Sequence, residues 1–113
     1  MGLDFNNSDA RWSYSGFNRF RRRLAEHEGF NLDQMQGFNG KRDWDEITTD
    51  LKPLLNHSDC DGELTPEECK QVGPRLYGIA MTWPEDDYDR RSALVLAEDM
   101  AKCVINDTSL EFC

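Results

Sequence analysis

Apolar residues recur along much of the chain at spacings of three and four, which is the period of an amphipathic helix. The first such run predicts a helix over about residues 16–28, with Ser15 as its N-cap and Gly29 at its end. Its apolar face consists of Phe17, Phe20 and Leu24. Because one face is apolar and the others are polar, we expect this helix to pack on a core by that face.

Two longer apolar runs follow in the second half of the chain. The first covers residues 69–83 and contains Gly73-Pro74, so we expect a kink there, or a restart in which Pro74 opens a second helix. The second predicts the strongest helix of the chain, from residue 85 to about 104. Its wide apolar face suggests contacts on more than one side. We expect that face to comprise Tyr88, Ala93, Leu94, Val95, Leu96, Ala97, Met100, Ala101 and Val104.

Shorter elements are predicted elsewhere. Residues 32–35 and 43–47 are each typical of a short helix, the second holding Trp44 and Ile47 inward. Residues 1–14 have no helical period and predict an extended segment with a strand near residues 3–5. The 106–113 tail can supply another strand, beside Leu64 or beside residues 3–5. The 113 residues therefore predict a single, mainly α-helical domain with one or two short strands at its termini.

Oxygen-bearing residues stand at regular intervals between residues 57 and 68, within a predicted helix-loop-helix unit over residues 49–83. With Gly62 at position 6, this stretch resembles the calcium-binding loop of the EF-hand family, which takes ligands at positions 1, 3, 5, 7, 9 and 12. The resemblance extends over about residues 51–77 and implies calcium as a cofactor. It implies as ligands Asp59, Asp61, the carbonyl of Glu63, Thr65 and Glu68.

Three features depart from the EF-hand pattern. Position 1 is His57, and an imidazole is a softer ligand than a carboxylate and adds no negative charge. Pro53 limits the incoming helix to two turns at most. EF-hands normally occur in pairs bridged by a small sheet, but the sequence contains no second loop. We therefore expect the tail, or another subunit, to supply the neighbouring strand.

The same residues permit two interpretations without calcium. Thr65-Pro66-Glu67-Glu68 is a helix start in its own right, with threonine at the N-cap and glutamate three residues later, so the loop could be a metal-free turn. His57, Cys60 and Cys69 are also the residue types of a zinc site, although their spacing matches no common zinc finger.

The charge of the chain narrows the class of partner. Twenty-two acidic and 13 basic residues give a net charge of −9, so direct binding to nucleic acid is not expected. A cation or a protein with a basic surface would be attracted instead. Nine acidic residues and one basic residue lie between residues 43 and 69, and Asp43, Asp45 and Glu46 are candidate contacts. Such a density is also typical of an inhibitor that mimics nucleic acid.

The one basic patch is the arginine cluster of the first helix, Arg19 and residues 21–23. It is either a solvated face whose arginines pair with the protein's own carboxylates, or a docking site for a phosphate or an acidic partner. In the second case Arg19, Arg22 and Arg23 are the candidate contacts.

The sequence favours binding over catalysis. It contains two histidines, no nucleophile elbow and no phosphate-binding glycine run. Four cysteines without a CxxC pair and without a preceding leader predict reduced thiols in the cytoplasm, and no run is long enough to span a membrane. We expect a small acidic protein that binds a basic protein partner, of the kind that phages use as inhibitors, or alternatively a calcium-binding module.

The chain as a whole also resembles small uncharacterised proteins of bacteria and their phages. The resemblance rests on its Trp-Ser-Tyr-Ser-Gly-Phe start and its His-Ser-Asp-Cys-Asp-Gly-Glu-Leu loop. It implies a prokaryotic soluble protein and supplies no function.

Overall fold

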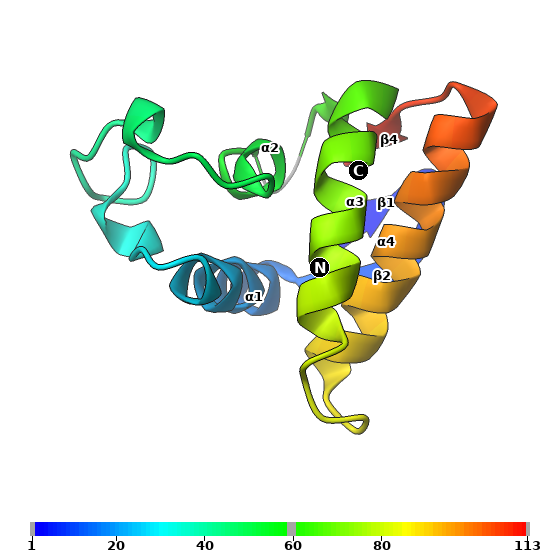
Figure 1. Cartoon of the computed structure of the whole chain (residues 1–113), viewed down its shortest axis with the longest axis horizontal. Coiled ribbons are helices and arrows are strands. Elements are labelled where there is room, and N and C mark those ends of the chain that lie inside the picture. The colour runs from blue at the N-terminus through cyan, green and yellow to red at the C-terminus, as the bar shows by residue number, and fades with distance from the viewer. Residues whose placement is uncertain (1, 59–60, 113) are drawn as a thin grey trace.

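The computed structural model describes residues 2–58 and 61–112, and within them the protein is mainly α-helical, as predicted (Figure 1). Two small antiparallel sheets accompany the helices. The elements in chain order are β1 (Gly2–Phe5), β2 (Ser8–Ser13), α1 (Tyr14–His27), the short 3₁₀ helices η1 (Leu32–Gln34) and η2 (Trp44–Glu46), α2 (Lys52–Leu55), β3 (Glu63–Leu64), α3 (Pro66–Ala80), α4 (Tyr88–Asn106) and β4 (Leu110–Glu111). None of the helices in this part of the chain is long and apolar enough to cross a membrane.

The longest helices, α3 and α4, lie side by side and antiparallel (Figure 1), and α4 also contacts β2. The predicted contact of α4 on more than one side is therefore confirmed. Its predicted buried face was partly wrong, because Tyr88, Val95 and Ala101 are exposed. The buried arc shares Ala93, Leu96, Ala97 and Met100 with the prediction and adds Ser92 and Cys103.

Helix α3 runs without a break through Gly73-Pro74, so the predicted restart at Pro74 was wrong. A proline inside a helix removes one hydrogen bond, here to the carbonyl of Lys70 four residues earlier. Both Lys70 and Pro74 are on the exposed side of α3, so water can donate a hydrogen bond to the Lys70 carbonyl instead. On the opposite side Gly73 packs against α4, and a Cβ added to it would lie 3.7 Å from the carbonyl oxygen of Ala97.

The N-terminal segment forms a hairpin in which Leu3 of β1 lies opposite Trp12 of β2. The strand near residues 3–5 was predicted, and β2 is an addition whose alternating residues Ala10 and Trp12 are buried. The indole of Trp12 stacks on the ring of Phe20 at 4.5 Å between centroids, which attaches the hairpin to α1. The hairpin therefore contributes part of the core.

Helix α1 begins at Tyr14 with Ser13 as its N-cap, so the prediction of Ser15 was wrong. The hydroxyl oxygen of Ser13 accepts a hydrogen bond of 3.0 Å from the amide of Gly16. Ser13 can cap because it ends β2 in an extended conformation, which the hairpin imposes. The predicted apolar stripe is buried as expected.

Residues 29–51 form an arm that lies beside α1 and α2, drawn in cyan to green at the left of Figure 1. As predicted, it contains two short helices and holds Trp44 and Ile47 inward. The ring of Trp44 meets those of Phe30 and Phe38 edge-on at 6.1 and 6.2 Å. These aromatic contacts give the arm its own small portion of core.

Candidate functional site

The stretch that resembles a calcium loop connects α2 to α3, and β3 lies within it. The incoming helix α2 has four residues and Pro53 in its first turn, as the prediction of a shortened helix required. Gly62 has a positive φ of 86°, a conformation that glycine adopts at little cost. Asp59 and Cys60 lie outside the described residues, so the predicted ligand at Asp59 is not placed.

Thr65 and Glu68, the first and last residues of the predicted helix start, form hydrogen bonds with each other. The hydroxyl oxygen of Thr65 accepts a hydrogen bond of 3.2 Å from the amide of Glu68, and the Glu68 carboxylate accepts one of 3.0 Å from the amide of Thr65. This is the reciprocal capping box that the sequence predicts. The carboxylate expected to close a calcium shell therefore already serves as a helix cap.

The imidazole of His57 is turned into the loop. Its Nε2 lies 3.0 Å from the carbonyl oxygen of Glu63, and its Nδ1 lies 2.8 Å from that of Ser58. The ring stacks on Phe112 at 4.0 Å between centroids, and a Cβ added to Gly62 would lie 3.1 Å from its Cε1. A carbonyl oxygen only accepts, so both contacts are hydrogen bonds when both ring nitrogens carry a proton. The ring thus reaches the carbonyl at position 7, which the EF-hand resemblance assigns to the metal.

Two of the residues predicted as ligands, Asp61 and Glu63, lie at the surface of the loop. No group of three His, Cys, Asp or Glu side chains within residues 2–58 and 61–112 is arranged to hold a metal ion. Of the residues considered for zinc, Cys69 is buried, and burial raises the pKa of its thiol to about 12. Zinc binds the thiolate, which this environment disfavours.

The C-terminal tail occupies the place beside the loop where a paired EF-hand would put its second loop. Leu64 pairs with Leu110 in an antiparallel ladder, and the amide of Phe112 donates to the carbonyl of Gly62 at 2.9 Å. On its other side the tail meets the hairpin, where Phe5 and Phe112 form an isolated bridge. The tail was predicted to lie beside Leu64 or residues 3–5, and it contacts both.

Arg22 and Arg23 of the arginine cluster pair with the protein's own carboxylates. Arg22 lies 2.9 Å from Asp33, and Arg23 lies 2.9 Å from Asp87 and 3.4 Å from Asp89. The guanidinium of Arg23 also covers the ring of Trp83. Arg19 is exposed and forms no ion pair with any described residue. Of the three predicted contact residues, Arg22 and Arg23 are therefore already in ion pairs, whereas Arg19 has none among the described residues.

The acidic candidates Asp43, Asp45 and Glu46 are together at η2 on the arm, and all three are exposed. The Asp43 carboxylate accepts a hydrogen bond of 2.9 Å from the amide of Asp45 and so caps η2. Glu46 lies 3.6 Å from Arg42. The structure brings these three residues together on one exposed turn.

Sequence reasoning missed Arg21, which it grouped with the exposed arginines. Its side chain is buried, its Nη1 donates to the carbonyl of His57 at 2.5 Å, and its guanidinium covers the rings of Phe17 and Phe38 at 4.7 and 5.0 Å. The available signal was its position, four residues after Phe17 on the apolar stripe of α1. A charged residue on such a stripe indicates a buried hydrogen-bonding role.

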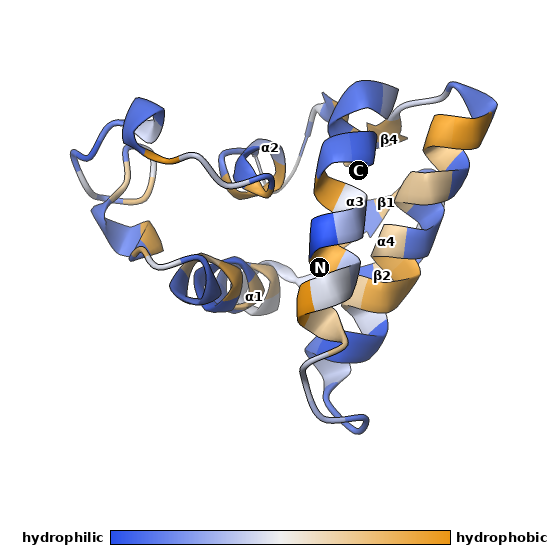
Figure 2. Cartoon of the chain, in the orientation of Figure 1, coloured by the Kyte–Doolittle hydropathy of each residue, from blue (hydrophilic) through white to orange (hydrophobic). Residues whose placement is uncertain are grey.

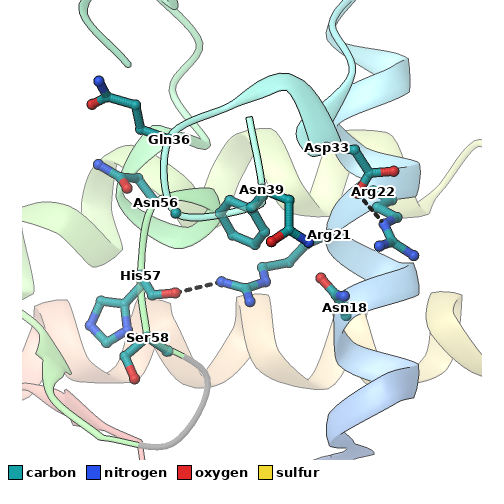
Figure 3. A pocket seen from close by; sticks show the side chains of 11 residues that line it. Asn18, Arg21, Arg22, Asp33, Gln36, Asn39, Asn56, His57 and Ser58 are labelled. Carbon is teal, nitrogen blue, oxygen red and sulfur yellow. Dashed lines mark hydrogen bonds and ion pairs between the residues drawn. The ribbon is translucent and has the colours of Figure 1, made fainter. Parts of the chain in front are cut away.

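Beside Arg21 a cleft of about 460 Å³ separates α1 from the turn at residues 36–39 and from residues 56–58 (Figure 3). Carboxamide side chains gather around it, from Asn18, Gln36, Asn39 and Asn56. The Oδ1 atom of Asn18 is buried and has no hydrogen-bond partner among the described residues. The cleft is therefore lined by groups that can donate and accept hydrogen bonds.

The fold and the loop define the class of this protein, a small and mainly α-helical protein whose helix-loop-helix unit is paired with its own C-terminal strand. Comparison of the chain with protein-family models, with curated proteins and with solved structures gives no match.

Proposed function

We propose that this chain is a regulatory binding protein that acts, without a catalytic step, on a protein partner with a basic surface, as an inhibitor of the phage type does. The observation that carries the proposal is how the charges are distributed. Many of the cations pair with carboxylates of the same chain, so their positive charge is neutralised locally. They are Arg11, Arg22, Arg23, Arg42, Arg75 and Lys102.

The acidic residues that remain face outward. Among the described residues, several exposed carboxylates between residues 43 and 67 form no ion pair with a cation of the chain. They are Asp43, Asp45, Asp50, Asp61, Glu63 and Glu67. A surface with one sign of charge attracts a partner of the opposite sign and accelerates the encounter. A basic surface, such as one that normally binds nucleic acid, suits these carboxylates.

The proposal is tested by capturing bacterial proteins on the immobilised chain at low and high salt. The test variant is Asp43→Asn with Asp45→Asn, in which the asparagine at 43 still caps η2. The matched control is Glu85→Gln with Asp86→Asn, which removes two charges from another exposed turn. We expect basic proteins to bind the wild type and the control at low salt, and to be lost at high salt and from the test variant. Capture that ignores both salt and the substitutions would refute the proposal.

We propose calcium binding by the 57–68 loop as the alternative. The positive φ of Gly62 and the exposed carboxylate of Asp61 support it. Calcium would have to displace the His57 ring from the Glu63 carbonyl and the Glu68 carboxylate from its cap. Calorimetric titration of chelator-treated protein with calcium, and with magnesium and zinc in parallel, tests it. Heat in the micromolar range with a raised Tm supports this alternative, and no heat at millimolar calcium refutes it.

A further inference from the structure

We propose that Cys69 and Cys103 join α3 to α4 through a disulfide bond when the chain folds under oxidising conditions. This goes beyond the proposed function and is independent of it, because it concerns the interface between two helices and not the acidic surface. In this structure both cysteines are free thiols, and they are only 1% and 2% exposed. Each is the fourth residue from an end of its helix, Cys69 from the start of α3 and Cys103 from the end of α4.

The packing of α3 on α4 places the two cysteines opposite each other. The helices are antiparallel (Figure 1), and Gly73 of α3 lies against Met100 of α4. Cys69 is one turn before Gly73 on α3. Cys103 is about one turn after Met100 on α4, so it occupies the matching level of the same interface. Figure 2 shows apolar residues recurring along both helices, and the two cysteines belong to the faces that these helices bury.

The two helices are close enough at this interface for a disulfide. A Cβ added to Gly73 would lie 3.5 Å from the Cβ of Met100. The Cβ atoms of a disulfide are separated by about 3.5–4.5 Å, so facing positions on α3 and α4 already have the required spacing. Burial raises the pKa of the Cys69 thiol to about 12, and charge repulsion from and a hydrogen bond with the Cys103 thiol add to that rise. The two thiols are therefore neighbours.

The proposed bond connects the elements that flank the β3–β4 sheet. Helix α3 begins just after β3, and α4 ends shortly before β4. The Sγ atom of Cys69 also lies 3.9 Å from the carbonyl oxygen of Leu64, which pairs with Leu110 of the tail. A bond between Cys69 and Cys103 therefore holds the 57–68 loop and the C-terminal tail together.

Thiol–disulfide exchange forms the bond, with a small disulfide such as oxidised glutathione as the oxidant. The thiolate of one cysteine attacks a sulfur of oxidised glutathione, which gives a mixed disulfide and releases one glutathione thiolate. The thiolate of the other cysteine then attacks the protein sulfur of the mixed disulfide and releases the second glutathione. The protein gives up two electrons and two protons, and both are taken up by the two molecules of reduced glutathione.

The burial of the thiols decides when this exchange takes place. Exchange needs a thiolate and access to the oxidant, and the folded interface disfavours both. The bond therefore forms while the chain folds, before α3 and α4 close on each other. A chain that folds in a reducing cytoplasm keeps both thiols, as the sequence predicts, whereas a chain that folds in an oxidising compartment joins them.

Refolding from urea in a glutathione redox buffer tests the proposal. The test variant is Cys60→Ser with Cys113→Ser, which retains Cys69 and Cys103 as its cysteines. We expect the refolded variant to lose the mass of two hydrogen atoms and to yield a 69–103 linked peptide on proteolysis. We also expect its Tm to be at least about 5 °C above that of its reduced form, because the bond restricts the unfolded chain.

The matched control has the same two serines and in addition Cys103→Ser with Lys102→Cys. It keeps two thiols, but one is moved to a position of α4 whose side chain is 71% exposed. We expect this control to acquire glutathione at position 102 and to form no link. Peptide mapping of the refolded wild type, in which a 69–103 link is also expected, does not depend on the serine substitutions.

Three results overturn the proposal. The first is a test variant and a wild type that refold without the 69–103 link. The second is a control that forms a link in equal yield, because the native packing would then not select the pair. The third is a linked variant whose Tm is no higher than that of its reduced form, because the folded helices would then not accommodate the geometry of the bond.

Discussion

The guanidinium of Arg21 donates a hydrogen bond of 2.5 Å from its Nη1 to the main-chain carbonyl of His57. The bond joins the middle of α1 to the first residue of the loop, 36 residues later in the chain. The same nitrogen lies 3.5 Å from the carbonyl of Leu55 at the end of α2. One buried cation thus satisfies carbonyls at a helix end, where partners within the helix are missing. The position of the loop against α1 depends on it.

Replacing Arg21 with lysine should therefore destabilise the protein. The ammonium of lysine is a point donor and cannot also cover the two aromatic rings as the planar guanidinium does. We expect Arg21→Lys to lower the free energy of unfolding by about 2 kcal/mol, measured by urea denaturation. The neighbouring Arg22→Lys, at a side chain that is 44% exposed, should change it by less than about 0.5 kcal/mol. Equal effects of the two changes would contradict the buried role of Arg21.

Replacing His57 with aspartate should increase the affinity of the loop for calcium. The change removes the ring that contacts the Glu63 carbonyl and supplies the carboxylate usual at position 1. We expect calorimetry to give a calcium affinity at least about tenfold above that of the wild type. His57→Asn, which removes the ring without adding a charge, is the control and should give a smaller increase. Equal affinities for the wild type and His57→Asp would show that the ring does not compete with the metal.

The contact between Glu28 and Arg75 should make stability depend on pH in the acid range. Arg75 donates two hydrogen bonds to the Glu28 carboxylate, at 2.9 and 2.7 Å, and these bonds contribute most to lowering the pKa of Glu28 from 4.5 to about 2. The unfolded chain therefore takes up this proton at a higher pH than the folded chain. The stabilisation is complete above about pH 4.5 and is lost as the pH falls through about 2.

Glu28→Gln should accordingly lower the free energy of unfolding by about 2 kcal/mol at neutral pH, a figure reduced because Arg75 is half exposed. The deficit relative to the wild type should shrink as the pH approaches 2. Urea denaturation of both proteins at neutral and acid pH measures this. Glu26→Gln, on the exposed face of the same helix, is the control and should show no such trend. A deficit that is constant with pH would contradict the linkage.

The thiol of Cys69 should be unreactive in the folded protein. Its side chain is 1% exposed, and burial raises its pKa to about 12, so little thiolate forms near neutral pH. Cys103 is buried beside it. In a variant with Cys60→Ser and Cys113→Ser, we expect a disulfide reagent to label neither remaining thiol in the native state and both in urea. Rapid labelling of the native variant would contradict this.

Several local features of the fold were predictable from the sequence. The capping box of Thr65 and Glu68, the turn at Gly62 and the shortened helix at Pro53 each depend on residues only a few positions apart. Their hydrogen bonds and φ angles are properties of short segments, so residue type and spacing are enough to predict them. The apolar stripe of α1 is predictable for the same reason.

Only the tertiary structure decided the features that involve residues far apart in the chain. Arg21 belongs to an arginine run in the sequence, and it is buried because Phe38 and the His57 carbonyl come together around it. The ring of His57 is held by Phe112, and α4 buries the arc that α3 and β2 cover. Sequence by itself determined which segments are helical, and for α3 also where the helix begins, because the periodicity and the capping box are local. The start of α1 was set by the hairpin instead. Which side chain fills the loop and which faces are buried depends on packing between distant segments, which residue spacing does not encode.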